Sequence, residues 1–587
     1  MLTRWNLNEI YGGFESPNFQ ADMERLKKSV EKLNELSRGL SDFTGVTALI
    51  EELERYETIS GLAGAYSELS FSIDTNCSDA VTYINKLNFM NAEISGARVR
   101  LAAFLANYRC ERESGEYAYF TKRMAAQYSH MLSEEEETLA AKMSVTGSGA
   151  WSILHDKLVS TLTCEYADPA ENGAVRTINI NDCRNLAYDG DARVRKAAYE
   201  AELNAYPKIA EVSAAAINGI KGEVGLISKL RGYEHPIDQT LFNSAVSREA
   251  FDAMFTAIDD NIQFFRDYLN LKAAYLAKKT GVTYNGLPFY DLFAPVGAAP
   301  DRNITFDEAV AFVRDNFQTF SPKMAEMATR AAELGWIDVY PGEGKVSGAF
   351  CSHIYALKEF RILLNFGGSV SDAVTLAHEL GHGYHSMNIM GERVLNTNYP
   401  MPLAETASTF FENILNNAVL ASLGGDEKLR ILENSLQDST QVIVDIYSRY
   451  LFEKNMFETR FSHPLPVGEL NELMLNAQRE AYGDGLNREF LHPYMWVIKP
   501  HYYFANQNFY NWPYAFGHLL ANGLYMIYEA EPSSFVEKYD AFLRNTGKMS
   551  VKNACASIGA DVEDKAFWTR AISAVRVKID EFARLVK

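Results

Sequence analysis

The feature that most constrains this chain is the motif H-E-L-G-H at residues 378–382. The apolar run 373–377 just before it indicates that the segment is helical. Residues four positions apart lie on one face of a helix, so His378 and His382 can present two imidazole nitrogens to one metal ion. Glu379 lies one position further round, where its carboxylate can contact a water on that metal without being a ligand itself.

Zinc suits such a site, because it accepts neutral imidazoles in tetrahedral geometry and lowers the pKa of a bound water to about 7. Glu379 can then take the proton when the water attacks a carbonyl group. The alternative is a helix whose histidines are ordinary surface residues. The flanking sequence argues against that, since Ser371 and Asp372 offer N-cap oxygens and Gly381 and Gly383 leave room for close approach.

A third metal ligand is available downstream. After a proline-containing loop, residues 403–412 are typical of a second helix, with Glu405 on its first turn. Two histidines and a downstream glutamate form the ligand set of a catalytic zinc site, whose fourth position is left to water. We therefore expect His378, His382 and Glu405 to bind one zinc ion, with Glu412 as the next candidate if Glu405 has no part in the site.

Length and composition exclude several classes of protein. The 587 residues are 47% hydrophobic, enough for a large core, and the net charge of −20 argues against binding to nucleic acid. No apolar run is long enough to cross a bilayer, and the N-terminus lacks the apolar region of a signal peptide. Scattered cysteines without a C-x-x-C pair indicate a cytoplasmic protein with buried, free thiols, and no feature indicates an oligomeric state. The six cysteines are Cys77, Cys110, Cys164, Cys183, Cys351 and Cys555.

Helical periodicity dominates the chain, beginning with a helical layer over residues 19–128. Residues 159–165 and 176–180 alternate with period two around an Asn-Gly pair, which predicts a β-hairpin. We expect two domains: an N-terminal helical lobe, 1–190, with the hairpin near its end, and a catalytic metallopeptidase domain, 191–587.

A small β-sheet is expected next to the metal-site helix. Residues 336–340 and 360–365 read as strands separated by a glycine-rich turn. The strand directly before the helix could offer its free backbone edge to an extended peptide, which would join the sheet as one more strand. The expected fold is therefore mainly α, zincin-like, with this small sheet beside the H-E-x-x-H helix.

The segment 492–518 is unusually rich in aromatic residues and contains histidines and prolines. Aromatic residues at this density usually form core. A histidine and several tyrosine hydroxyls in a proline-broken segment are also what a site for an oxyanion or a substrate carbonyl requires.

Several stretches together resemble the oligoendopeptidase F group of the thimet oligopeptidase family of zinc metallopeptidases. They are H-E-L-G-H at 378–382, A-E-T-A-S-T-F-F-E at 404–412, N-F-G-G at 365–368, F-Y-N-W-P-Y-A-F-G at 509–517 and the opening W-N-L-N-E-I-Y-G-G-F at 5–14. The resemblance covers nearly the whole chain, and the combination of motifs is highly specific.

The resemblance implies a zinc-dependent endopeptidase with His378, His382 and Glu405 as ligands and Glu379 as the base. It also implies a mainly helical fold of two lobes around a deep channel. Such a channel admits short, unstructured peptides and excludes folded proteins, so short peptides are the expected partners.

The family's late histidine and tyrosine residues hold the substrate and stabilise the tetrahedral intermediate. By the resemblance these roles fall to His501, Tyr510 and Tyr514. Tyr502 and Tyr503 are the alternatives, because the spacing after His501 differs from that in thimet oligopeptidase.

Two other functions are compatible with parts of this pattern. A helical zinc carboxypeptidase would use the same ligands but must anchor a C-terminal carboxylate, and Lys499 and Arg488 are the nearest cations in the sequence. A catalytically silent peptide-binding scaffold is disfavoured, because the intact Glu379 is the residue whose loss would silence the site most simply.

Overall fold

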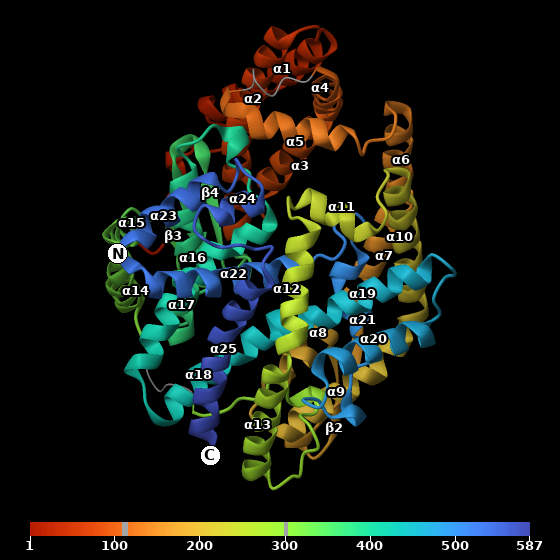
Figure 1. The fold of residues 1–587 in the computed structure, drawn as a ribbon, viewed down its shortest axis with the longest axis vertical. Coiled ribbons are helices and arrows are strands. Elements are labelled where there is room, and N and C mark those ends of the chain that lie inside the picture. The colour runs from red at the N-terminus through yellow and green to blue at the C-terminus, as the bar shows by residue number, and fades with distance from the viewer. Residues whose placement is uncertain (109–114, 299–302) are drawn as a thin grey trace. The chain divides into compact units, whose positions relative to one another are not determined.

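The computed structural model describes residues 1–108, 115–298 and 303–587, and it confirms the expected, mainly helical fold (Figure 1). The chain divides into two compact units, each built from three segments. Unit 1 comprises Met1–Met131, Asp301–Val419 and Ile527–Ala560, and unit 2 comprises Leu132–Pro300, Leu420–Met526 and Asp561–Lys587. A boundary near residue 190 would fall inside unit 2, and as a border between independently folding domains it stays a prediction.

Unit 1 opens with the helical layer that the sequence predicts. Local capping sets its helix starts: the Ser16 side chain accepts the Phe19 N–H before α1, and Asp42 accepts the Gly45 N–H before α2. The helices of unit 1 are α1 (Pro17–Arg38), α2 (Phe43–Ile73), α3 (Ser78–Glu93), α4 (Ser95–Tyr108), α5 (Ala118–Tyr128), α14 (Phe306–Phe320), α15 (Pro322–Glu333), α16 (Val370–Ile389), α17 (Met401–Ser422), α23 (Pro532–Asn545) and α24 (Val551–Ala556).

A three-stranded sheet lies in unit 1, in the strand order β3-β5-β4. Its strands are β3 (Ile337–Asp338), β4 (Phe350–Ile354) and β5 (Glu359–Leu363), with β3 parallel and β4 antiparallel to β5. The expectation that the strand before the metal-site helix has a free edge is wrong, because β5 is the central strand. The edge belongs to β4, which sequence analysis merged with the glycine-rich turn because the strand begins only two residues after the left-handed Gly348.

The two faces of this sheet contact different helices. Ile354 and Leu363 belong to the hydrophobic core that α1 to α4 build, and α2 packs against β4. On the other face α16 packs against β4 and β5, and Figure 1 shows α16 next to β4. A Cβ on Gly383 would lie 2.7 Å from the ring of Phe360, so glycine at this position lets α16 approach the sheet closely.

Unit 2 contains the predicted hairpin, formed by β1 (Thr163–Asp168) and β2 (Ala174–Asn179). Asn172 and Gly173 have positive φ angles of 55° and 78°, as a tight Asn-Gly turn requires. The first strand starts later than expected, because helix α7 continues to Thr161. The helices of unit 2 are α6 (Glu134–Thr146), α7 (Ser148–Thr161), α8 (Ile180–Asn185), α9 (Ala192–Ala205), α10 (Ala210–Leu230), α11 (Pro236–Asn243), α12 (Arg248–Asn261), α13 (Gln263–Thr280), α18 (Gly425–Thr440), α19 (Ile446–Arg460), α20 (Val467–Tyr482), α21 (Met495–Ile498), α22 (Trp512–Ala530) and α25 (Lys565–Val586).

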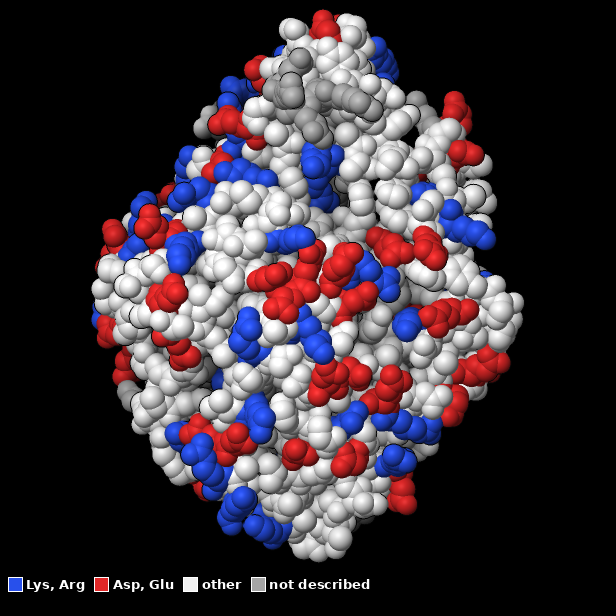
Figure 2. Space-filling model, in the orientation of Figure 1, with Lys and Arg blue, Asp and Glu red and all other residues white. Residues whose placement is uncertain are grey.

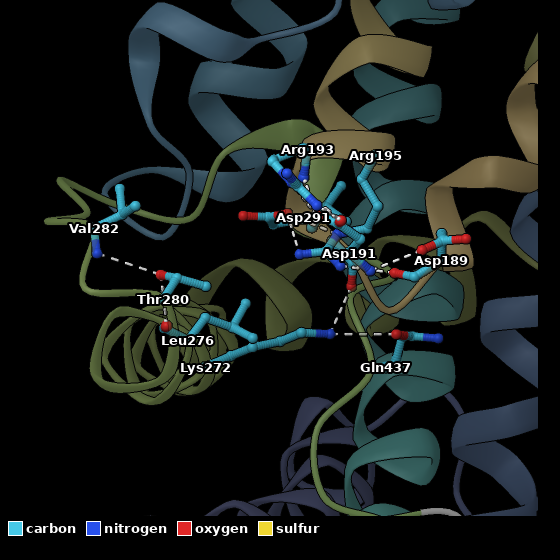
Figure 3. Close-up of polar contacts among 11 residues, drawn as sticks. Asp189, Asp191, Arg193, Arg195, Lys272, Leu276, Thr280, Val282, Asp291 and Gln437 are labelled. Atoms are coloured by element: carbon cyan, nitrogen blue, oxygen red, sulfur yellow. Dashed lines mark hydrogen bonds and ion pairs between the residues drawn. The ribbon is translucent and has the colours of Figure 1, made fainter. Parts of the chain in front are cut away.

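Buried ion pairs join the helices of unit 2. Asp291 is fully buried and accepts from the Arg195 guanidinium at 2.8 Å, and Figure 3 shows the two side chains together. Lys272 donates to Glu433 at 2.5 Å and to the Gln437 amide oxygen at 3.3 Å. These charges are compensated inside the unit, as buried charges must be.

The surface carries mixed charge. Acidic and basic side chains are interspersed on the face that Figure 2 shows, and the 76 acidic residues outnumber the 56 basic ones. In the part of the chain that the structure describes, no helix combines the length and the apolar character needed to cross a bilayer.

The five described cysteines are free, as expected. Cys164, Cys183 and Cys555 are buried, whereas Cys77 and Cys351 are partly exposed, so the expectation of burial is wrong for these two. Cys110 lies outside the described residues.

Candidate metal and catalytic centre

The helix that carries the H-E-x-x-H motif, α16, begins with a capping box. The Ser369 hydroxyl accepts the Asp372 N–H at 3.1 Å, and the Asp372 carboxylate accepts the Ser369 N–H at 2.8 Å. The expectation that Ser371 supplies the cap is therefore wrong. Asp372 contributes from the third helical position, because a carboxylate there can reach back to the cap residue.

Two helices bring the three predicted ligands together. His378 and His382 lie on one face of α16, with ring centroids 5.1 Å apart. Glu405 comes from α17, where it starts the second turn rather than lying on the first. Its Oε2 atom lies 3.3 Å from His378 Nε2 and 3.4 Å from His382 Nε2, and the three donor atoms lie within 4.8 Å of one another.

This donor set fits a tetrahedral zinc ion. Bonds of about 2.1 Å to a tetrahedral metal place neighbouring donor atoms about 3.4 Å apart, close to the separations observed here. The charge also fits: burial lowers the pKa of His378, but hydrogen bonds to Glu405 and Glu412 outweigh it and raise the pKa to about 10. The carboxylates that stabilise the protonated, positively charged His378 would also stabilise a metal cation in the same place.

The close packing of α16 and α17 depends on Gly381. A Cβ at this position would lie 2.7 Å from the Ser408 Cα atom. The glycine is thus required for contact between the two ligand-bearing helices rather than for space beside the metal, as the sequence had suggested.

Glu412 contacts the first histidine from its other side. Its Oε2 atom lies 3.2 Å from His378 Nδ1, and the residue is about two turns beyond Glu405 on α17. A carboxylate in this position accepts the Nδ1–H and leaves the Nε2 lone pair for a metal. The structure therefore gives Glu412 a supporting contact, whereas the sequence had offered it as a replacement ligand.

Glu379 is 5% exposed and lies among the predicted ligands. Burial raises the pKa of its carboxyl group, against the lowering effect of His382 and His378. A carboxylate whose basicity is raised in this way is a better proton acceptor.

Tyr399 is a residue near the centre that sequence analysis missed. It precedes α17, and its ring stacks on His385 with centroids 4.1 Å apart. Burial raises the pKa of its hydroxyl, and the negative charge of Glu405 raises it further. A tyrosine followed by proline six residues before a ligand was the available signal, but the segment read as a plain connector.

The free edge of β4 carries unpaired backbone groups. The N–H groups of Ile362 in β5 and of Leu364, the residue after β5, donate to carbonyl oxygens on the β3 side of the sheet. Cys351 lies opposite Ile362 and His353 lies opposite Phe360, so the N–H and C=O groups of Cys351 and His353 point away from β5. Within the described residues, no protein group is recorded as their hydrogen-bond partner.

In unit 2, the three residues expected to act on the substrate form one cluster. The His501 and Tyr510 rings stack with centroids 4.5 Å apart, and the Tyr510 and Tyr514 hydroxyls are 3.2 Å apart. The alternatives, Tyr502 and Tyr503, are 1% and 0% exposed and are core residues. The roles of all five in catalysis stay predictions.

Two cations, Arg449 and Lys499, act on His501 in this cluster. Burial lowers the pKa of His501 to about 4, and the charges of Arg449 and Lys499 lower it further. Burial and the nearby Arg449 lower the pKa of Lys499 to about 7. Arg488, the other cation noted in the sequence, is exposed.

Two family models match the chain. The model described as peptidase family M3 matches residues 185–574, and the model described as oligopeptidase F matches residues 102–163. The first match includes every predicted ligand and Glu379.

Individual proteins are similar over most of their length. Oligopeptidase PepF of Bacillus subtilis (strain 168) is 22% identical over 600 residues, covering 99% of this chain and 87% of the relative. An oligoendopeptidase F homolog of Lactococcus lactis subsp. lactis is 25% identical over 477 residues, covering 80% of this chain and 77% of the relative. The crystal structure of oligoendopeptidase-F from Enterococcus faecium has the same fold, with a TM-score of 0.72 and 19% identity over 97% of this chain and 99% of that one.

Proposed function

This chain belongs to peptidase family M3, and we propose that it is a zinc-dependent endopeptidase that hydrolyses internal bonds of short, unstructured peptides. The family makes it a metallopeptidase, and the names of its relatives agree with action on oligopeptides. The observation that carries the proposal is the convergence of His378, His382 and Glu405 beside the buried Glu379.

The free edge of β4 is the proposed binding surface for the peptide backbone. Its outward N–H and C=O groups, on Cys351 and His353, can pair with an extended peptide as a further strand. The two residues are close enough to the centre for electrostatic interaction, Cys351 with Glu379 and His353 with His382. A peptide bound along this edge would therefore lie near Glu379, the proposed base.

The residues of this centre divide the chemistry among them. Zinc, when bound, polarises the scissile carbonyl and makes a water acidic enough to lose its proton near pH 7. Glu379 accepts that proton as the water oxygen bonds to the carbonyl carbon, and it passes the proton to the departing amine. Glu412 keeps His378 in the tautomer and orientation that leave Nε2 free.

We assign His501, Tyr510 and Tyr514 to the substrate carbonyl and the oxyanion that develops from it. Their support is the family resemblance and their mutual contacts within unit 2. A hydroxyl or imidazole that donates to the oxyanion typically contributes about 3 kcal/mol to transition-state stabilisation.

The remaining parts of the proposal concern access and location. We propose two lobes around a channel that excludes folded proteins, and a cytoplasmic enzyme. The support for the channel is the family resemblance, and the support for the location is the free state of the described cysteines. Cleavage of a flexible peptide, without cleavage of a stable folded protein under native conditions, is the outcome that this access model requires.

A zinc carboxypeptidase is the second candidate. Lys499, half-buried beside Arg449, is a cation that could anchor a C-terminal carboxylate. An internally quenched peptide with an amidated C-terminus separates the two: an endopeptidase cuts it, and a carboxypeptidase does not.

Matched variants of the centre test the function. Glu379→Gln should retain zinc and lose about 10²–10⁴-fold in kcat, because only the base is removed. Glu405→Ala should lose zinc and activity together, and readdition of zinc to the chelator-treated wild-type protein should restore activity. Elemental analysis and a quenched-peptide assay measure both properties. Full zinc content and full activity in Glu405→Ala would remove this residue from the site.

A further inference from the structure

A groove of about 570 Å³ lies in unit 1 along the free edge of β4. Helix α2 forms one wall, α3 forms the second, and the β4 residues 350–353 form the third. Its volume is in the range of ligand-binding clefts. A peptide that adds to the edge of β4 would send some of its side chains into this groove, because side chains alternate along a strand.

The α2 wall is built from residues at helical spacing, most of which have small side chains. The groove is lined by Ser60, Gly61, Gly64, Ala65, Glu68, Leu69 and Ser72 of α2. A Cβ on Gly61 would meet no atom within 4 Å, so the space above this glycine is open. Two glycines in the interior of a helix are costly to its stability, and here they keep the groove wide.

The lining has an apolar part and an acidic part. Ile84 and Leu87 of α3 contribute the apolar part together with Phe350 of β4. The carboxylates are Glu57, which pairs with Arg98, and Glu68. No lysine or arginine lines the groove within the described part of the chain.

Glu68 is the carboxylate that is available to a ligand. No ion pair or side-chain hydrogen bond of its carboxylate is recorded among the described residues. The side chain is exposed at the mouth of the groove, and partial burial among the groove residues raises the pKa of its carboxyl group. A bound ammonium or guanidinium group would supply the missing partner.

We infer that this groove selects substrates by one basic side chain, with Glu68 as the residue that determines the preference. A lysine or arginine of the bound peptide lays its aliphatic stem against the apolar wall and directs its cation to Glu68. The inference rests on the proposed peptidase function and names the substrate class for that site.

The test uses the full-length, zinc-loaded protein and a set of internally quenched peptides. Each peptide carries one lysine at a different position within three residues of the scissile bond, and matched peptides carry glutamine or glutamate there. At one position we expect kcat/KM to be about tenfold higher for lysine than for glutamine, and lower still for glutamate.

Variants of Glu68 separate selection from folding. Glu68→Gln should abolish the lysine preference while the glutamine peptide is cut as before, and Glu68→Lys should favour the glutamate peptide. Glu93→Gln, an exposed glutamate at the end of α3 outside the groove, is the matched control and should keep the preference. Zinc content and thermal unfolding confirm that each variant is folded.

Three outcomes overturn the inference, and their consequences for the proposed function differ. Equal cleavage of all peptides by the wild type, or a lysine preference that survives Glu68→Gln, would refute the role of Glu68 and leave the endopeptidase intact. Failure of the zinc-loaded wild type to cut any peptide would refute the proposed function and, with it, this inference.

Discussion

Two groups of charged side chains, one in each unit, are arranged in opposite ways. In unit 2, Lys272 donates to Glu433, so each buried charge has a partner of opposite sign. In unit 1, His378, His382 and Glu405 direct their donor atoms to one point, and no lysine or arginine is recorded among their ion-pair partners in the described part of the chain.

The difference separates structural charge from functional charge. A buried carboxylate that meets a lysine holds helices together and does no chemistry. Three donors that converge without a cation lower the stability of the metal-free protein slightly. Metal binding then raises the stability of the folded protein. Burial of a charged group therefore does not by itself identify a functional site. The informative observation is that the converging groups have no partner of opposite charge.

The largest expected effect comes from breaking a pair in unit 2. Lys272→Met should lower the free energy of unfolding by about 3–5 kcal/mol, because it leaves Glu433 buried without its cation. Urea denaturation followed by tryptophan fluorescence measures this loss. Zinc content should be unchanged in the fraction that remains folded.

A control and a double variant sharpen this prediction. Lys454→Met removes an exposed lysine of α19 in the same unit and should change stability little. Lys272→Met combined with Glu433→Leu should recover most of the loss, since neither charge is then buried alone. Wild-type stability in Lys272→Met would show that the pair contributes nothing to the fold.

The next effect concerns a hydroxyl of unit 2 that we assign to catalysis rather than to structure. Tyr514→Phe should lower kcat by about 10²-fold with a modest change in KM, because only the hydroxyl that donates to the oxyanion is removed. Melting temperature and zinc content should stay near the wild-type values. Tyr188→Phe, at an exposed tyrosine of the same unit, is the control.

An unchanged kcat in Tyr514→Phe would make this tyrosine a packing residue. The role would then pass to Tyr510, whose hydroxyl is 3.2 Å away, or to His501.

Local sequence signals predicted the parts of the structure that depend on neighbours in the chain. The i, i+4 spacing of His378 and His382 fixed their common face, and the Asn-Gly pair at 172–173 gave the hairpin turn. Strand β4 was missed, because its pairing with β5 is a contact between segments and follows a glycine-rich stretch. The free edge was consequently assigned to the wrong strand.

The side chains that contact the proposed metal ligands could not be predicted from the sequence either. Glu412 could be recognised as a carboxylate near Glu405, but only the packing of α16 on α17 shows that it contacts His378 Nδ1. The proximity of Tyr399 to the ligands likewise depends on how its loop folds. The proposed ligands can be named from their spacing in the sequence, whereas the side chains that contact those ligands are known only from the packing of the helices.

A smaller effect is expected from this support. Glu412→Gln should weaken zinc binding by about 10–100-fold, because the amide holds the His378 ring less firmly and no longer raises its basicity. Competition with a fluorescent zinc chelator measures the affinity, and kcat at saturating zinc should fall less than in Glu379→Gln. An affinity equal to that of the wild type would mean that the contact with Glu412 does not orient the ligand.

The smallest effect tests whether a glycine that lines the groove of unit 1 lowers the free energy of unfolding. Gly61 lies inside α2, and a Cβ there would meet no atom within 4 Å. Gly61→Ala should therefore stabilise the protein by about 1 kcal/mol, since alanine is the better helix former and restricts the unfolded chain. Because the added methyl group points into open space of the groove, kcat/KM for the lysine peptide should fall at the same time, by about twofold.

Gly468→Ala provides the comparison in unit 2. Gly468 lies in the first turn of α20, and a Cβ there also meets no atom within 4 Å, but the residue does not line the groove. This variant should gain stability without any change in kcat/KM. If Gly61→Ala gains stability and cuts every peptide as fast as the wild type, the glycine is a neutral feature of the helix. If Gly61→Ala loses activity while Gly468→Ala does not, α2 retains a destabilising glycine at this position because a larger side chain would obstruct the substrate.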